Sequence, residues 1–230
     1  MPALDIITGL RGSGKTTFIN LLLQEVYKDS RVSVIQNELG KIPLDSSILE
    51  RKKTEVEQLT GGCVCCTLQT NLLEGIRRQI KTSRPDSIIL EAAGEGRPDD
   101  ILRLRDYQQD LHPHFCVHVI DGSRYLALRS LMGAALTAPI TQSRMLYVNR
   151  LSVNPERISD VLSDLRELQP DAYILHDAPA FLPEAFREDS KIIPFSVQNL
   201  LSLTEQLSAS ADSVRTRTPS RKAFIRITPY

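Results

Sequence analysis

Short runs of consecutive apolar residues alternate along this chain with longer segments in which apolar residues recur every three or four positions. The short runs are typical of strands buried on both faces, and the spaced pattern is typical of helices with one apolar face. Strands that alternate with helices predict an α/β fold, a three-layer sandwich with a mostly parallel central sheet. We expect strands at residues 3–8, 31–35, 87–90, 115–120, 145–148 and 191–195.

Two apolar stripes at helical spacing support this interpretation. One comprises Leu68, Leu72, Leu73, Ile76 and Ile80, and the other comprises Ile158, Val161, Leu162, Leu165 and Leu168. Asn154 followed by Pro155 is typical of the start of the second helix. From residue 208 the chain becomes rich in small and polar residues, so we predict one nucleotide-binding domain over 1–207 and a linker with a short C-terminal tail or strand over 208–230.

The first expected strand and the helix after it are joined by Gly9-Leu10-Arg11-Gly12-Ser13-Gly14-Lys15-Thr16, which fits the phosphate-loop pattern G-x-x-x-x-G-K-[ST]. A chance match to a glycine-rich turn is the alternative, but the flanking strand and helix supply the context that the motif needs. The predicted phosphate contacts of this motif are Gly9, Gly12, Ser13, Gly14, Lys15, Thr16 and Thr17. Lys15 is expected to reach the outer phosphates, and the Thr16 hydroxyl is expected to bind Mg²⁺.

Composition narrows the remaining functions. The 230 residues are 41% hydrophobic, with 28 lysines and arginines balanced by 28 aspartates and glutamates, so no overall charge attracts nucleic acid or a membrane surface. No apolar run approaches the roughly 20 residues of a membrane span, and residues 1–5 do not resemble a secretory signal. We therefore expect a cytoplasmic protein that binds neither nucleic acid nor membrane.

Three of the four cysteines lie together in Gly61-Gly62-Cys63-Val64-Cys65-Cys66. Deprotonated thiols at this spacing can converge on one transition ion if the chain bends, and the two glycines permit the bend. Three thiolates leave a tetrahedral ion one ligand short, which favours metal transfer over a closed structural site. Buried inert cysteines and a thiol redox pair are the alternatives.

A phosphate loop followed by Gly-Gly-Cys-x-Cys-Cys resembles the CobW-like metallochaperone branch of the CobW/HypB/UreG-type P-loop GTPases. Residues 36–40 with Asp45 resemble the switch segment of that family, and Glu91-Ala92-Ala93-Gly94 resembles its E-x-x-G motif. The resemblance covers roughly residues 3–205 and implies a SIMIBI-like P-loop fold. It also implies a Mg²⁺-dependent GTP (or ATP) hydrolase that binds Zn²⁺ or another transition metal and serves a client metalloprotein. A homodimer is compatible with the resemblance.

Glu38 and Glu91 each follow a hydrophobic strand. Both are thereby expected at C-terminal strand ends beside the phosphates, where a carboxylate can hold Mg²⁺ or orient the attacking water. Either glutamate can instead cap the next helix or pair with a cation. We predict Lys15, Glu91 and Glu38 as catalytic residues. The predicted metal ligands are Thr16, Glu38 and Glu91 for Mg²⁺ and Cys63, Cys65 and Cys66 for the transition ion.

The sequence departs from the family pattern at the base-recognition motif. The family uses Asn-Lys-x-Asp, whose carboxylate accepts from the ring N–H and exocyclic amine of guanine, whereas this chain has Asn149-Arg150-Leu151-Ser152. The resemblance implies that Asn149 and Arg150 are base contacts. A serine offers no bidentate charged acceptor, so guanine discrimination is expected to weaken. ATP use, relaxed specificity and slow hydrolysis stay open. Lys41 stands where the family usually has glutamate, and Gly122-Ser123-Arg124-Tyr125 follows Asp121 where many relatives have a histidine.

A further set of residues alternates in the fourth expected strand region: His112, His114, Cys116 and His118. Period-two spacing can place them on one strand face, but we interpret Cys116 and His118 as core residues and expect Pro113 to keep His112 and His114 outside the ladder. A small-molecule kinase and a non-catalytic nucleotide or metal sensor remain the rival functions.

Overall fold

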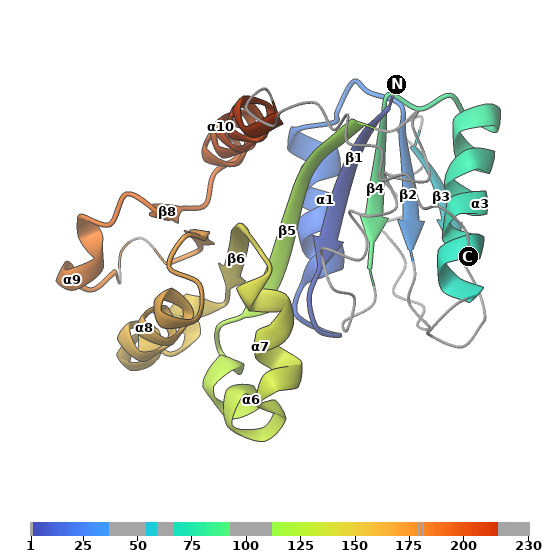
Figure 1. Cartoon of the computed structure of the whole chain (residues 1–230). Helices are drawn as coiled ribbons and strands as arrows, with labels where there is room; N and C mark the ends of the chain where they lie inside the picture. The colour runs from blue at the N-terminus through green and yellow to red at the C-terminus, as the bar shows by residue number, and fades with distance from the viewer. Residues whose placement is uncertain are drawn as a thin grey trace, which may run out of the picture.

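Eight parallel strands form one sheet in the order β3-β2-β4-β1-β5-β6-β7-β8, as seen in the computed structural model (Figure 1). The structure describes residues 2–36, 54–58, 67–92, 112–178, 180 and 182–215. Because all strand pairs in this sheet are parallel, the expected mostly parallel sheet is confirmed. The strands are β1 (Ala3–Thr8), β2 (Val32–Gln36), β3 (Thr54–Gln58), β4 (Ser87–Glu91), β5 (His112–Asp121), β6 (Met145–Asn149), β7 (Tyr173–His176) and β8 (Ile192–Pro194).

Helices cover both faces of this sheet, as the alternation of patterns predicts. On one face α1 and α10 pack over the strands through buried residues such as Leu22 and Leu203. On the other face α3 contributes Ile76, and α6, α7 and α8 contribute a second cluster that includes Leu162. The helices are α1 (Lys15–Glu25), α3 (Thr67–Thr82), α6 (Tyr125–Met132), α7 (Ala134–Thr141), α8 (Ile158–Leu168), α9 (Glu184–Arg187) and α10 (Val197–Arg215), with 3-10 turns η1 (Leu151–Val153) and η2 (Pro155–Arg157).

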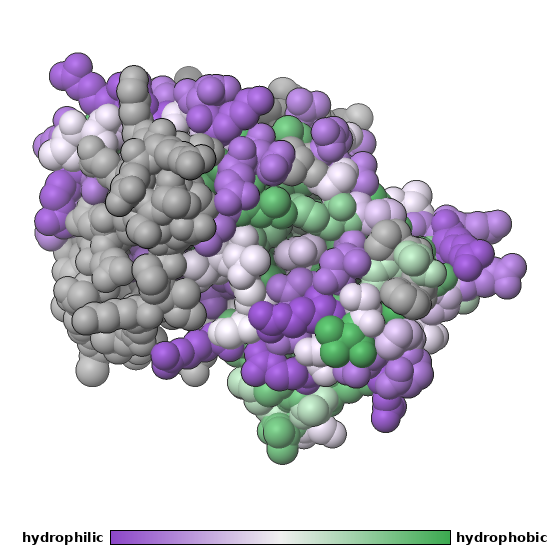
Figure 2. Space-filling model, turned by 180° about the vertical axis from the view of Figure 1, so that it is seen from behind, coloured by the Kyte–Doolittle hydropathy of each residue, from purple (hydrophilic) through white to green (hydrophobic). Residues whose placement is uncertain are grey.

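The central strands are apolar throughout because both of their faces are covered. All five residues of β2 and of β4 are buried, as are the last five of β1. Figure 2 shows a surface in which apolar side chains are scattered among polar ones. Among the described residues, the exposed large hydrophobic side chains are Leu131 and Val153. No helix in the described part of the chain is long and apolar enough to cross a membrane.

The structure corrects several expectations about individual elements. Strands β3 and β7 were not anticipated, because one is polar in sequence and the other has only four residues. Strand β5 begins at His112, and Pro113 lies in the ladder opposite Leu4. The register between β1 and β5 shifts after this pair, between Leu4 and Asp5. The expectation that Pro113 keeps its neighbours outside the ladder was therefore wrong for His112.

Two helix ends also differ from their sequence signals. Asn154 does not start α8; it precedes η2, and its side-chain amide donates to the Ser123 carbonyl at 3.2 Å. Helix α10 continues to Arg215, beyond the boundary predicted at residue 207, so the small and polar residues 208–215 are helical. The predicted tail after Arg215 lies outside the described residues.

Candidate functional site

The loop between β1 and α1 adopts backbone conformations that require glycine. Gly9 has φ +136° and Gly14 has φ +99°, values that L side chains rarely adopt. A Cβ at Gly9 would lie 2.3 Å from the Val119 carbonyl oxygen, and one at Gly14 would lie 2.2 Å from the Asn149 side-chain nitrogen. These glycines therefore allow the loop to curl against the ends of β5 and β6, which is the geometry expected of a phosphate loop.

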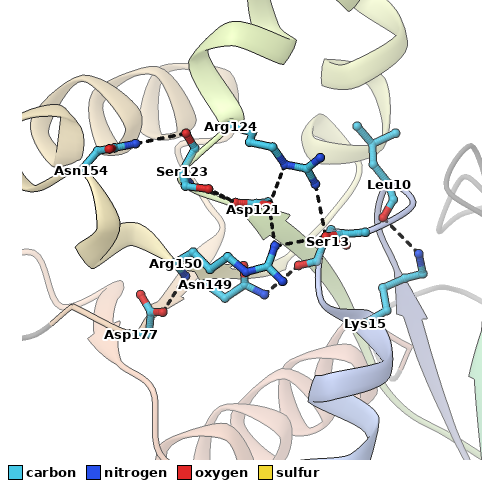
Figure 3. A network of polar contacts seen from close by, with 11 residues as sticks. Leu10, Ser13, Lys15, Asp121, Ser123, Arg124, Asn149, Arg150, Asn154 and Asp177 are labelled. Carbon is cyan, nitrogen blue, oxygen red and sulfur yellow. Dashed lines mark hydrogen bonds and ion pairs between the residues drawn. The ribbon is translucent and has the colours of Figure 1, made fainter. Parts of the chain in front are cut away.

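Lys15 is the first residue of α1, and its side chain folds back onto the loop. Its ammonium group is buried and donates to the carbonyl oxygens of Gly9 at 2.9 Å and Leu10 at 3.1 Å (Figure 3). The Ser13 hydroxyl is also buried and has no hydrogen-bond partner among the described residues. A helix N-terminus with an adjacent ammonium group attracts an anion, so this loop is suited to bind phosphate oxygens.

Glu91 ends β4 directly beside the loop. Its carboxylate accepts a hydrogen bond from the Thr16 hydroxyl at 3.2 Å and another from the Gln36 amide at 2.7 Å. Only 2% of Glu91 is exposed. Hydroxyl and carboxylate oxygens are the ligands that Mg²⁺ prefers, so Thr16 and Glu91 together fit a magnesium ion bound with phosphates. Gln36 begins the segment that resembles the family's switch, but the sequence alone predicts no role for its side chain.

The segment after β6 holds the phosphate loop from its other side. The Asn149 amide donates to the Ser13 carbonyl at 2.7 Å, and the Arg150 guanidinium donates to the Gly12 carbonyl at 3.2 Å. Arg150 has φ +51°, which turns the chain sharply at the end of the strand. Residues predicted to lie near the base thus also fix the conformation of the phosphate loop (Figure 3).

Asp121, at the end of β5, joins these two segments. Its carboxylate accepts from Arg124 at 2.8 Å, from Arg150 at 2.7 Å and from the Ser123 hydroxyl at 2.6 Å. Burial opposes ionisation of this carboxyl, but the hydrogen bonds from Ser123, Arg124 and Arg150 outweigh it and lower its pKa below the ordinary value. Arg124 also donates to the Gly12 carbonyl at 3.2 Å. Sequence reasoning missed these partners of Asp121, because Arg124 lies in the turn before α6 and Arg150 follows a different strand, β6.

The two histidines of β5 whose side chains the structure describes, His114 and His118, have separate partners. His118 is fully buried, pairs with the Thr8 hydroxyl at 2.9 Å, and has its pKa lowered to about 4 by burial and by the Lys15 charge. His114 instead contacts the buried Asp5 carboxylate at 2.9 Å. No group of three or more possible metal-ligating side chains occurs within the described ranges.

Other predicted site residues have separate outcomes. Thr17 is exposed on the first turn of α1. Glu38 and the three cysteines Cys63, Cys65 and Cys66 lie outside the described residues, so their predicted roles stay predictions. At one edge of the sheet the structure brings together five residues that the sequence predicts for nucleotide binding: Lys15, Thr16, Glu91, Asn149 and Arg150.

A parallel sheet, a glycine-rich loop that begins a helix and a carboxylate beside the helix threonine define a P-loop nucleotide-binding protein. Within that class the chain belongs to the CobW/HypB/UreG family, because the model of the family's nucleotide-binding domain matches residues 3–176. The resemblance proposed from the sequence is thereby confirmed.

Curated relatives agree with this assignment. The chain is 33% identical over 104 residues to the zinc chaperone YeiR of Escherichia coli K12, covering 45% of this chain and 32% of YeiR. It is 33% identical over 134 residues to the zinc chaperone CobW of a Sinorhizobium species, covering 54% and 38% of the two chains. The zinc-regulated GTPase metalloprotein activator 1 of Dictyostelium discoideum is 23% identical over 224 residues, covering 78% and 46%. The chain thus spans less than half the length of these relatives.

Solved structures share the fold. The hydrogenase maturation factor HypB of Archaeoglobus fulgidus superposes with a TM-score of 0.56 at 16% identity, covering 76% of this chain and 80% of HypB. The Zn(II)-bound YjiA GTPase of E. coli gives a TM-score of 0.56 at 14% identity, covering 75% and 56%. At these identities the likeness establishes the fold alone.

Proposed function

We propose that this chain is a Mg²⁺-dependent nucleoside triphosphate hydrolase of the GTPase type that couples nucleotide turnover to the binding or delivery of a transition metal. The observation that carries the proposal is the 3.2 Å contact between the Thr16 hydroxyl and the Glu91 carboxylate, next to the Lys15 ammonium group. This arrangement places oxygen ligands for a divalent cation and a cationic group for phosphate at the same point.

The side chains on this edge have distinct roles in the proposal. Backbone N–H groups of the loop and the Lys15 ammonium bind phosphate oxygens, while Asn149 and Arg150 keep the loop in shape through its carbonyl groups. Glu91 is expected to orient the attacking water, and the buried amide of Gln36 holds its carboxylate in position. Thr16 and Glu91 would hold Mg²⁺, which would neutralise the charge of the phosphates.

The metal-delivery part rests on the sequence and on the relatives. Cys63, Cys65 and Cys66 are soft ligands at a spacing that can converge on zinc or a similar ion, and curated relatives are named zinc chaperones. Glu38 precedes the cysteines in sequence and is expected to bind Mg²⁺ or to orient the attacking water. The recipient in this proposal is a client metalloprotein in the same compartment, which we expect to be the cytoplasm.

Phosphate release tests the hydrolase. Replacing Glu91 by glutamine should lower Mg²⁺-dependent turnover by about 10- to 100-fold, as loss of a carboxylate that orients a metal or its water usually does. Glu25→Gln, an exposed change at the other end of α1, is the matched control and should leave turnover unchanged. Single-turnover release of inorganic phosphate with GTP and with ATP measures both variants.

The same assay separates the rival functions. Phosphate that appears on an added small-molecule acceptor rather than in solution would indicate a kinase. Wild-type turnover no faster than that of Lys15→Ala, with nucleotide binding intact, would indicate a sensor without hydrolysis. Either result contradicts the proposed hydrolase.

Metal coupling needs its own measurement. A variant with serine at Cys63, Cys65 and Cys66 should bind Zn²⁺ more weakly than the wild type, because a hydroxyl is a far poorer zinc ligand than a thiolate. Competition with a chromogenic chelator, with and without nucleotide, gives the two affinities. Equal affinities in the two proteins would remove the metallochaperone part and leave the hydrolase intact.

A further inference from the structure

We infer that Asp177, directly after β7, supplies the carboxylate that selects a guanine base in this chain, in place of the acidic residue missing at Ser152. The inference rests on the proposed function, because it assigns the base specificity of the same nucleotide site. It replaces the expectation of weakened guanine discrimination with a carboxylate that reaches the base from the neighbouring strand.

The sheet register brings Asp177 to the nucleotide side. Strands β6 and β7 are parallel and pair Val148 with His176, so Asn149 and Asp177 follow at the same level. Asn149 is known to face the phosphate loop, because its amide reaches the Ser13 carbonyl at 2.7 Å. Asp177 directly follows the end of β7 and Asn149 ends β6, so both residues lie at the carboxyl edge of the sheet.

The surroundings of Tyr147 support this placement. Tyr147 packs against Phe18 of α1, with ring centroids 5.0 Å apart, so it marks the face of the sheet that α1 covers. Burial, and after it the negative charge of Asp177, raises the pKa of Tyr147 to about 12. The Asp177 carboxylate is thus close enough to act electrostatically on a side chain that packs against α1, the helix that begins at the phosphate loop.

Direct contacts hold Asp177 against the base-recognition segment. One carboxylate oxygen accepts from the backbone N–H of Arg150 at 2.5 Å, and the other accepts from that of Leu151 at 3.0 Å. Figure 3 shows Asp177 beside Arg150 and Asn149. The carboxylate thus lies against the same four-residue segment in which Ser152 occupies the position expected to be acidic.

The remaining capacity of this carboxylate suits guanine. An ionised carboxylate has about four acceptor positions, and the two backbone groups use one on each oxygen. The two left can accept the ring N–H and the exocyclic amine of guanine together. Adenine presents an acceptor at the corresponding ring nitrogen and would be repelled, whereas the single hydroxyl of Ser152 distinguishes the two bases poorly.

Exchanging the Asp177 carboxylate for an amide tests this assignment, because the variant should gain affinity for a different base. Asp177→Asn should weaken GDP binding by about tenfold to a hundredfold, the value of a hydrogen bond to a charged group. The same variant should bind xanthosine diphosphate more tightly than the wild type does, because xanthine has a carbonyl where guanine has the amine and an amide can donate to it. Fluorescence competition titrations against GDP, ADP and xanthosine diphosphate, in the presence of Mg²⁺, measure the preferences.

Two further variants keep the test decisive. Ser152→Asn places the same amide at the position where the family has its acidic residue and should leave the preference for GDP over xanthosine diphosphate unchanged. Asp177→Ser retains an acceptor for the backbone N–H groups but carries no charge, so it should lose guanine preference without gaining xanthine binding. Thermal melting of each variant confirms that it is folded.

The outcomes distinguish this inference from the proposed function. Equal weakening of GDP and xanthosine diphosphate by Asp177→Asn would show that Asp177 only anchors the segment, and the inference would be overturned. An exchange of preference in Ser152→Asn instead would overturn it as well. Wild-type protein that binds none of the diphosphates would contradict the proposed nucleotide site itself.

Discussion

Individual atoms decide whether the phosphate loop can form. Gly14 lies so close to Asn149 that even one methyl group at that position would collide with the amide that donates to Ser13. Asp121 has a comparable influence, since Arg124 and Arg150 both bind its carboxylate and both donate to the Gly12 carbonyl. The loop is therefore held by three side chains from outside the motif, although the motif alone predicts its function.

Replacing Gly14 by alanine tests this dependence. The new Cβ would lie 2.2 Å from the Asn149 side-chain nitrogen, so the contact to Ser13 must break and nucleotide affinity should fall by about 100-fold. Gly133→Ala is the matched control, because Gly133 also has a positive φ (+51°) but no atom lies within 4 Å of its added Cβ. The control should lose about 1–3 kcal/mol of unfolding free energy through backbone strain and keep its nucleotide affinity.

Isothermal titration with GDP and urea unfolding, applied to both variants, separate binding from stability. If Gly14→Ala binds nucleotide as the wild type does, the contact between Asn149 and Ser13 has no part in forming the site.

At the scale of elements, the ends of neighbouring strands create the site. Glu91 lies level with Ile7 of β1 and with Gln36 of β2, so the order β2-β4-β1 brings the Gln36 amide and the loop threonine to one carboxylate. Helix α1 is anchored at its far end as well, where the Tyr27 hydroxyl donates to the buried Asp5 carboxylate of β1. The position of α1 is thus fixed at both ends by polar contacts and between them by apolar packing.

The packing of α8 provides a prediction at this scale. Leu162 is completely buried on the apolar stripe of α8, so Leu162→Ala should cost about 2–5 kcal/mol of unfolding free energy through the cavity that it leaves. Leu131→Ala, the same change at a helix residue that is 82% exposed, should cost less than about 0.5 kcal/mol. Urea unfolding followed by circular dichroism compares the two, and similar losses would contradict the assignment of the α8 stripe to the core.

Much of this element level could be predicted from sequence. The runs around Ile89 and Val148 and the stripe around Leu162 identified buried strands and a helix, because burial on two faces or one imposes a local pattern of apolar residues. Strand β3 could not be predicted in this way, since Thr54–Gln58 has only one apolar residue, Val56, and is paired through its backbone to β2. Strand β7 is only four residues long and ends in the polar His176, so its pattern is too short to recognise.

On the scale of the whole molecule, acidic and basic residues balance, so we expect single buried titratable groups to determine how stability depends on pH. The chain has 28 basic and 28 acidic residues, so self-repulsion is small near neutral pH. His118 is the buried group beside the phosphate loop whose pKa is lowered to about 4. Its neutral form, paired with Thr8, is therefore part of the stable fold.

The pH dependence follows from this lowered pKa. Between the ordinary pKa of 6.5 and the folded value of about 4, the unfolded chain binds the His118 proton more readily than the folded chain does. The contribution of His118 is thus fully present above pH 6.5 and is lost as the pH falls towards 4, by an amount on the order of 3 kcal/mol. His118→Gln cannot titrate, so its unfolding free energy should fall less over this window. Parallel curves for the two proteins in urea titrations from pH 4 to 7 would exclude His118 as the cause.

The chain by itself determined those features that depend on neighbouring residues. The glycine pattern and the lysine of residues 9–16 define the phosphate loop, and the apolar periodicity defines a layered α/β fold, because turn geometry and helix or strand burial are local requirements. The family resemblance also came from short motifs in a fixed order.

Only the tertiary structure decided which distant side chains meet. Thr16 and Glu91 are 75 residues apart, and the Asp177 carboxylate reaches Arg150 across 27 residues. These contacts depend on the order of strands in the sheet, which is set by the packing of all layers together and leaves no local pattern in the sequence. Ser152 showed that a base-reading carboxylate was missing from one segment, and the sheet placed Asp177 beside that segment.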